Sequence, residues 1–203
     1  MITELFPIAV GTYRVPTLSE EERSFIKSQT TYKNIGNKTS KQTFLLNDPI
    51  LSGLKKQLEG LLLSYLDEIY RPSTECGVEI TQSWANYADK KGQYHHLHAH
   101  PNSFISGVLY VQASAEDRLN FTKETEKYAP RIYPAEVTPF NALAWWIPVQ
   151  TNDLLIFPSD LLHDVPPIKE DRTEDTARIS LSFNTKLIGT IGDERSLNWM
   201  EVS

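Results

Sequence analysis

The chain has a single cysteine, Cys76, among its 203 residues. One cysteine excludes an internal disulfide and a thiolate metal cluster within the chain. We therefore expect a reducing, cytoplasmic compartment, or the host cytoplasm if a phage encodes the protein. The sequence also lacks about eighteen unbroken apolar residues, and its N-terminus has no basic segment followed by an apolar run. We expect neither secretion nor membrane insertion.

Positive charge is also scarce, because 20 Lys and Arg residues face 26 Asp and Glu residues, for a net charge of −6. No stretch of the sequence is dominated by Lys and Arg, so the basic face of a nucleic-acid binder is missing and nucleic acid is not an expected partner. Hydrophobic residues make up 40% of the chain and charged residues 23%, as in a folded globular protein. Composition excludes these classes but names no function.

The first part of the chain predicts a strand and two helices. We expect a strand over residues 5–15 and then a short helix, since Ser19 and Glu22 form a capping-box pattern. A longer helix should begin at Asp48, the residue before a proline, and end before Pro72. Its leucines recur at helical spacing, which predicts a face packed against a sheet.

From residue 78 the pattern changes to short β-type runs separated by turn residues, which is typical of an all-β sandwich or barrel. The length is that of one domain. Residues 122–141 are too long for a turn and predict a structured insertion, and the charged residues 169–176 predict a mobile, solvated loop. We expect strands at 81–87, 104–111, 118–121, 153–157 and 178–184, in a single domain 1–203 made of an N-terminal strand and helix scaffold 1–77, a β core 78–190 and a tail 191–203.

Four of the five histidines lie within six residues, at His95, His96, His98 and His100, and the fifth is His163. In an extended segment His98 and His100 point to the same side, as does His96. Neutral imidazole binds iron, copper, zinc and nickel. His163 follows the apolar run DLLIFPSDLL, which should place it at the end of a neighbouring strand. The pattern favours a metal site of His98, His100 and His163, and the alternatives are a polar surface cluster or a zinc site.

The segment ARISLSFN places Arg178, Ser180, Ser182 and Asn184 on one face of a strand. An arginine beside serine hydroxyls in a sheet interior is suited to holding a carboxylate through two hydrogen bonds. Tyr110 could donate its phenol to the same carboxylate. The alternative is that Arg178 pairs with a structural Asp or Glu.

Three ordered segments, GQYHHLHAHPNSFISGVLYV, LIFPSDLLHDVPP and RISLSFN, resemble the 2-oxoglutarate and iron(II)-dependent oxygenases, close to a small bacterial and phage group in the prolyl-hydroxylase-like superfamily. The resemblance covers residues 84–184, half of the chain. It implies a mainly β fold with flanking helices, a double-stranded β-helix (a cupin-like jelly-roll) with iron at its open mouth.

By this resemblance His98 and His163 take the positions of the two iron-binding histidines. Arg178 takes that of the arginine on the distal carboxylate of 2-oxoglutarate, Ser180 is its hydroxyl companion, and Tyr110 matches a tyrosine on the same carboxylate. The resemblance implies iron(II) as cofactor and 2-oxoglutarate as co-substrate.

His100 departs from the commonest pattern of the superfamily, in which Asp or Glu stands two residues after the first histidine. A third neutral ligand leaves the iron with its full charge, which puts the need for 2-oxoglutarate in question. Two alternatives stay open: a register shifted to His96 and His98, and a carboxylate from Asp164. We prefer His98 and His100 because the lead-in GQY matches the spacing before the family's first metal histidine.

The sequence thus predicts a hydroxylase that uses molecular oxygen, iron(II) and 2-oxoglutarate on a substrate that no pattern identifies. The alternatives are a three-histidine, cupin-like metal dioxygenase without 2-oxoglutarate and a non-catalytic metal-binding module. Trp145, Trp146 and Tyr128 are candidate pocket walls, although aromatic residues in this fold are more often core. Barrel edges and the tail 191–203 would suit a homodimer.

Overall fold

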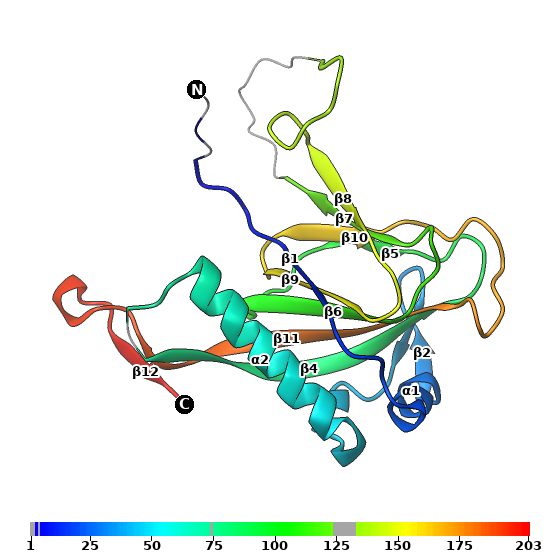
Figure 1. Cartoon of the computed structure of the whole chain (residues 1–203), viewed down its shortest axis with the longest axis horizontal. Coiled ribbons are helices and arrows are strands. Elements are labelled where there is room, and N and C mark those ends of the chain that lie inside the picture. The colour runs from blue at the N-terminus through cyan, green and yellow to red at the C-terminus, as the bar shows by residue number, and fades with distance from the viewer. Residues whose placement is uncertain (1–2, 4, 74, 124–132) are drawn as a thin grey trace.

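The computed structural model describes residues 3, 5–73, 75–123 and 133–203, which contain two facing antiparallel sheets (Figure 1). In these residues an eight-stranded sheet, here the major sheet, runs in the order β1 (Gly11–Arg14), β9 (Asp153–Pro158), β6 (Ile105–Gln112), β11 (Arg178–Ile191), β4 (Cys76–Ala88), β3 (Lys38–Ser40) and β2 (Thr31–Lys33), with β12 (Met200–Val202) paired to β11. The minor sheet has the order β5 (His95–His98), β10 (Leu162–Val165), β7 (Arg118–Thr122) and β8 (Ala144–Pro148).

Two helices lie against the face of the major sheet that is turned away from the minor sheet (Figure 1). The predicted capping box starts α1 (Glu20–Lys27), because the Glu22 N–H donates to Ser19 Oγ at 3.2 Å and the Ser19 N–H donates to the Glu22 carboxylate at 2.8 Å. Helix α2 (Ser52–Ile69) follows a 3₁₀ turn, Pro49–Leu51, in which the Ile50 N–H donates to the Asp48 side chain at 3.0 Å. Two further 3₁₀ turns span Leu45–Asn47 and Glu194–Ser196.

Strict alternation along β6 and β11 separates two apolar cores. Leu109 and Leu181 point toward the helices and join the buried leucines of α2. Val108 and Tyr110 point the other way and pack with Phe121 of the minor sheet. Because side chains two apart share one face, the polar residues predicted on one side of β11 lie between the two sheets. The expected mainly β jelly-roll with flanking helices is confirmed.

Gly107 in β6 makes one packing position very sensitive to substitution. It lies opposite Phe183, and a Cβ at Gly107 would come within 2.1 Å of the Phe183 ring. We expect Gly107→Ala to lower the free energy of unfolding by about 1–3 kcal/mol through overpacking. Denaturant titration measures this effect. The matched control is Gly60→Ala in α2, where a Cβ meets nothing within 4 Å and helix propensity should raise stability by about 1 kcal/mol. Equal stability of Gly107→Ala and the native chain would contradict the packing.

The structure corrects two predictions about the strands. The strand expected over 5–15 begins only at Gly11, because Phe6 has a φ of 58° and Pro7 has no N–H to donate. The run leading to His163 is not one strand but two in different sheets. Strand β9 ends at Pro158 in the major sheet, and β10 begins at Leu162 in the minor sheet.

Other predicted segments differ in extent. Strands β4 and β11 are longer than expected, since they pair with each other from Arg178 opposite Ala88 to Gly189 opposite Cys76. Part of the predicted insertion, residues 124–132 including Tyr128, lies outside the described residues. Among the described helices none is long and apolar enough to cross a membrane.

Candidate metal centre and anion pocket

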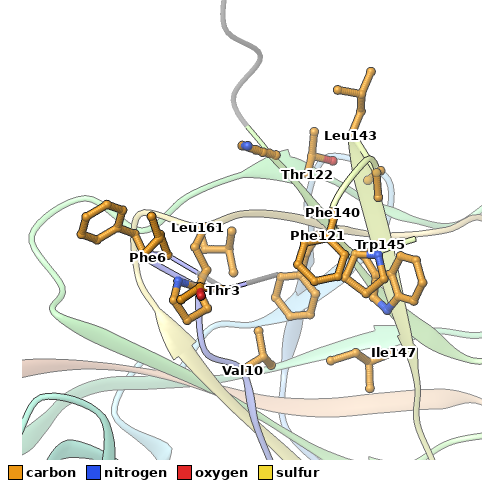
Figure 2. Close-up of a pocket in the computed structure, with 17 residues that line it drawn as sticks. Thr3, Phe6, Val10, Phe121, Thr122, Phe140, Leu143, Trp145, Ile147 and Leu161 are labelled. Carbon is orange, nitrogen blue, oxygen red and sulfur yellow. The ribbon is translucent and has the colours of Figure 1, made fainter. Parts of the chain in front are cut away.

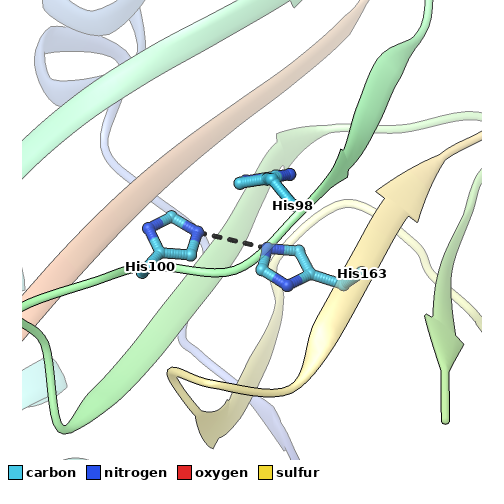
Figure 3. Close-up of side chains that lie close together, drawn as sticks. All are labelled: His98, His100 and His163. Carbon is cyan, nitrogen blue, oxygen red and sulfur yellow. Dashed lines mark hydrogen bonds between the residues drawn. The ribbon is translucent and has the colours of Figure 1, made fainter. Parts of the chain in front are cut away.

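Three histidines, which come from β5, from the residues just after it and from the neighbouring strand β10, lie close together (Figure 3). His98 in β5 is the register partner of His163 in β10. His100 follows β5, and its backbone N–H donates to the Ser159 carbonyl at 2.8 Å, which fixes the chain beyond the strand. One ring nitrogen from each histidine lies within 4.8 Å of the other two. This spacing allows one ion to be bound by all three.

Backbone carbonyls set the tautomers of two of these rings. His98 Nδ1 lies 2.8 Å from the His96 carbonyl oxygen, and His163 Nδ1 lies 2.8 Å from that of Leu161. A carbonyl only accepts, so each Nδ1 carries the proton and each Nε2 keeps a free lone pair. His100 Nε2 lies 3.2 Å from His163 Nε2 and donates to it in the metal-free chain. Backbone carbonyls that accept from the Nδ1–H of His98 and His163 fix the orientation of both rings, as is common for histidines that bind a metal.

Burial keeps these imidazoles neutral. It lowers the pKa of His163 to about 3, with the charge of His98 as the next cause. It lowers the pKa of His100 to about 4, again with His98 second. The pKa of His98 is lowered chiefly by burial as well. Near neutral pH all three side chains therefore offer lone pairs without first losing a proton.

The two alternative ligand sets are disfavoured by this geometry. Asp164 points to the outer face of the minor sheet, where its carboxylate accepts from Asn120 Nδ2 at 2.8 Å. His96 is not one of the three grouped residues, although its ring centroid is 5.0 Å from that of His98. The side chains of β5 do not alternate strictly between the two faces of the sheet. The pairing register of β5 and β10 shifts between His98 and His95, and the rings of these two residues stack with a centroid distance of 4.6 Å.

Beside this cluster lies a small cavity of about 20 Å³, lined among others by Arg178, Ser180, Tyr110, His95 and Asn37. A cavity of that volume holds about one water molecule, or a group as small as a carboxylate. The Tyr110 hydroxyl and Asn37 Oδ1 are buried without a hydrogen-bond partner among the described residues. Burial raises the pKa of Tyr110, so its O–H remains a donor. Unpaired buried polar atoms are costly, and a bound carboxylate would pair with the phenol.

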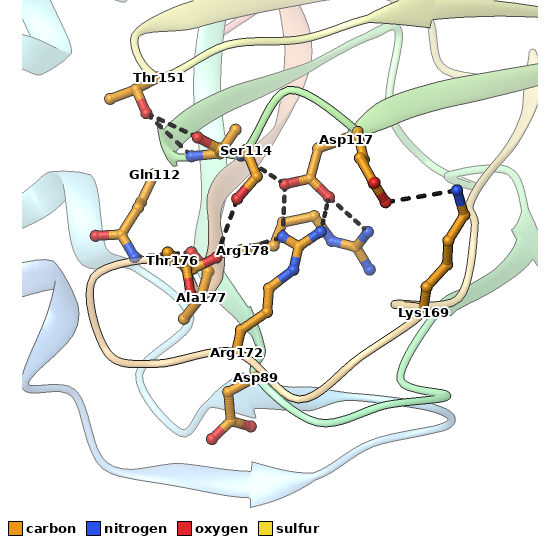
Figure 4. Close-up of polar contacts among 12 residues, drawn as sticks. Asp89, Gln112, Ser114, Asp117, Thr151, Lys169, Arg172, Thr176, Ala177 and Arg178 are labelled. Atoms are coloured by element: carbon orange, nitrogen blue, oxygen red, sulfur yellow. Dashed lines mark hydrogen bonds and ion pairs between the residues drawn. The ribbon is translucent and has the colours of Figure 1, made fainter.

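Arg178 is held by a buried carboxylate that a second arginine shares (Figure 4). Arg178 Nη1 donates to Asp117 Oδ1 at 3.2 Å and to the Pro166 carbonyl at 3.2 Å. Arg172 donates to both Asp117 oxygens, at 2.7 and 3.0 Å. The side chain of Asp117 is 1% exposed. Arg178 therefore does pair with a buried Asp. Because two guanidinium groups share this one carboxylate, the group of three keeps a net positive charge, and Arg178 can still attract an anion.

Residues 169–176 lie outside helices and strands, as predicted, and are exposed with the exception of Arg172. Its side chain is only 12% exposed, and its backbone N–H donates to the Asp89 carbonyl at 2.8 Å. The loop is therefore tied to the body of the protein beside Arg178. Neither Asp117 nor Arg172 was singled out in the sequence, because each lies in a short charged segment that looks like an exposed turn.

The other polar side chains of β11 are engaged between the sheets. Ser182 Oγ accepts from Asn86 Nδ2 at 3.2 Å, and Asn184 Oδ1 accepts from Ser106 Oγ at 3.2 Å. Asn184 is also a hydrogen-bond partner of His100. Of the predicted aromatic walls, Trp145 and Trp146 are 44% and 53% exposed, so neither is core.

Comparisons with known proteins agree with this architecture. No curated protein sequence matches the chain. Three of the solved structures that match have 11–12% identity, a level at which the likeness shows the fold alone. An oxidoreductase of the 2OG-Fe(II) oxygenase family from Burkholderia pseudomallei matches with 11% identity and a TM-score of 0.55, covering 87% of this chain and 84% of that one.

Two further structures give similar values. HygX from Streptomyces hygroscopicus, solved with nickel and 2-oxoglutarate bound, has 11% identity and a TM-score of 0.53, with coverage of 87% and 82%. A Pseudomonas putida prolyl-4-hydroxylase has 12% identity and a TM-score of 0.52, with coverage of 87% and 92%.

A family model described as "Putative 2OG-Fe(II) oxygenase" matches residues 82–184, half of the chain. The match contains the three clustered histidines together with Tyr110, Arg178 and Ser180. The chain belongs to the 2OG-Fe(II) oxygenase family.

Proposed function

We propose that the chain is an iron(II)- and 2-oxoglutarate-dependent dioxygenase that hydroxylates its substrate, with iron held by His98, His100 and His163. The observation that carries this proposal is the pairing of two features: three imidazole nitrogens within 4.8 Å of one another, and an adjoining cavity with a buried, unpartnered phenol and a guanidinium. HygX, a fold relative, is named as binding nickel and 2-oxoglutarate, which supports the same cofactor pair here.

In this proposal each side chain has a defined task. Iron(II) and 2-oxoglutarate supply the oxygen activation, with release of succinate and carbon dioxide and oxidation of a substrate C–H bond. Arg178, Ser180 and Tyr110 bind the distal carboxylate and so orient the co-substrate toward the histidines. Asp117 and Arg172 are positioning residues, since they hold the Arg178 guanidinium without touching the co-substrate. The packed sheets keep water from the site.

The presence of His100, where a carboxylate is the commoner iron ligand, supports one alternative enzymatic activity on the same fold. A third neutral ligand in place of a carboxylate is compatible with a three-histidine dioxygenase in which Arg178 holds a carboxylate of the substrate itself. Oxygen consumption separates the two activities, because our proposal requires 2-oxoglutarate and yields succinate in step with it. Oxygen uptake without 2-oxoglutarate would favour the alternative, and metal binding with no turnover would indicate a non-catalytic module.

Tyr110 gives a graded test of the anion pocket. Tyr110→Phe removes one hydroxyl from a fully buried side chain and leaves the ring in place. We expect the Kd for 2-oxoglutarate to rise about 2- to 10-fold, the value of one hydrogen bond of about 0.5–1.5 kcal/mol, while stability stays level or increases because the unpaired hydroxyl is gone. The matched control is Tyr65→Phe, whose hydroxyl donates to the Ala9 carbonyl at 2.8 Å under α2. That variant should lose stability and keep the native Kd; the reverse pattern would contradict the assignment.

Further expectations about the whole protein belong to the same proposal. We propose a single domain over 1–203 in a reducing cytoplasm, with molecular oxygen and a substrate of unknown class as partners and no nucleic acid. The single cysteine and the net charge of −6 support this. A homodimer through sheet edges and the tail 191–203, where β12 pairs with β11, is testable by sedimentation.

A further inference from the structure

An apolar cleft of about 620 Å³ opens at one edge of the sandwich, where the N-terminal segment and the edge strand β8 lie on opposite sides of it (Figure 2). Its walls include Phe6 and Val10 on the N-terminal side, and Phe140, Trp145 and Ile147 on the other. Its volume falls in the range of sites that bind small molecules, about 300–1,000 Å³. Nothing in the assignment of the metal centre or the anion pocket uses this cleft.

The register of the minor sheet connects the cleft to the histidine cluster. His98, His163, Phe121 and Trp145 are successive cross-strand partners on β5, β10, β7 and β8. Cross-strand partners point to the same face of a sheet, so the cleft and the three histidines share the inner face. Two strand spacings, about 10 Å, separate His163 from Trp145. Phe121 is the boundary, since it lines the cleft and its ring centroid lies 6.4 Å from that of His163.

The cleft leaves large apolar side chains in contact with solvent. Phe140 is 67% exposed, Leu143 59% and Trp145 44%. All three line the cleft rather than being scattered over the surface. Exposed apolar side chains gathered in one concave site indicate a ligand that covers them, and the aromatic lining favours a ligand with a flat ring.

One charge stands at this otherwise apolar site. Lys123 is the single charged residue among the described residues that line the cleft, and it is exposed. Its backbone is fixed by a hydrogen bond from the Lys123 N–H to the Leu143 carbonyl at 2.9 Å. The hydroxyl of Thr122 lies beside it in sequence and also lines the cleft. A ligand with an anionic group near its apolar body complements this arrangement.

We propose that this cleft anchors the substrate, a small organic acid with an aromatic or ring-shaped apolar body, about 10 Å from the metal. This inference rests on the proposed function for its link to oxidation, whereas binding in the cleft requires no metal. The anchored ring packs against Trp145 and Phe140, its anionic group faces Lys123, and the rest of the molecule extends past Phe121 toward the histidines. Substrates must then be longer than the anchored ring alone.

The first test uses two fluorescent probes on the metal-free 203-residue chain: anilinonaphthalene sulfonate, an aromatic anion, and N-phenylnaphthylamine, its uncharged relative. Trp145→Ala should weaken both probes about tenfold. Lys123→Gln should weaken only the anionic probe, about threefold. Trp146→Ala is the matched control, because Trp146 is the next residue, is 53% exposed and lies on the outer face beside Arg118. Its affinities should be native.

Native affinities in Trp145→Ala, or an equal loss in Trp146→Ala, would overturn the site. A loss of both probes in Lys123→Gln would overturn the charge assignment. The second test loads the chain with Mn(II), verified by its electron paramagnetic resonance signal, and measures line broadening of probe protons. Strong broadening that Trp145→Ala abolishes places the cleft beside the metal. Tight probe binding without broadening in Mn(II)-loaded protein would overturn the substrate role, while a chain that fails to load Mn(II) would count against the proposed function instead.

Discussion

Replacing His163 with alanine should lower the affinity for Fe(II) by at least about 100-fold, because loss of even an outer-shell partner of a metal ligand costs 10- to 100-fold. His163 is 3% exposed, and its Nδ1 is already committed to the Leu161 carbonyl. Its Nε2 is therefore preoriented toward His98 and His100, and no other described side chain is placed to replace it. Metal binding can be measured by competition with a chelating dye.

His96→Ala is the matched control for this loss. His96 is also an imidazole in the same cluster, and its ring stacks on that of His95 at 5.3 Å, but it stands outside the group of three. We expect its Fe(II) affinity to stay within a few-fold of native. Loss of iron in His96→Ala with retention in His163→Ala would show that the shifted register of ligands is correct and that our assignment is wrong.

Arg178→Met should raise the Kd for 2-oxoglutarate by about 100-fold or more and leave Fe(II) affinity unchanged. Truncating one partner of a buried charge pair costs about 2–5 kcal/mol. Arg178 is 6% exposed, and burial lowers the pKa of its guanidinium while Asp117 opposes that shift, so the group stays charged. Calorimetric titration with the co-substrate measures the change.

The Asp117 carboxylate should keep hydrogen-bond partners when Arg178 is replaced. It keeps both bonds from Arg172 and accepts the Ser114 N–H at 2.8 Å, so the variant is expected to fold. Arg14→Met serves as the control, since Arg14 pairs with Asp153 at 2.9 Å on the far edge of the major sheet. An unchanged Kd in a folded Arg178→Met protein would leave Arg178 with a purely structural role.

Local patterns in the sequence were sufficient for much of the fold. The capping box at Ser19 and Glu22 and the leucine spacing of α2 depend on neighbours within a few residues, so both were predicted correctly. The same holds for the alternation on β11, which places Arg178 and Ser180 between the sheets. Short strands such as β2 and β3 were missed, because β3 becomes a strand through pairing with the distant β4, and β2 pairs only with β3.

The site was less predictable where it depends on long-range geometry. Alternation alone places His95 away from His98, and the register shift that brings their rings together depends on pairing with β10. Asp117, Arg172 and Arg178 come from three separate segments, and nothing in their spacing indicates a shared buried carboxylate. The apolar cleft was anticipated only in part. Trp145, named as a candidate pocket wall, lines it, whereas Trp146 is not among the lining residues, and nothing in the sequence indicates that the N-terminal segment lies opposite β8.

The most direct test of the account is an anaerobic titration of the Fe(II)-loaded chain with 2-oxoglutarate, followed by visible absorption. We predict a weak metal-to-ligand charge-transfer band that grows to saturation. That band should be absent in His163→Ala and should require far more ligand in Arg178→Met. No band at any concentration, in protein that holds stoichiometric iron, would contradict the 2-oxoglutarate assignment and favour a three-histidine dioxygenase.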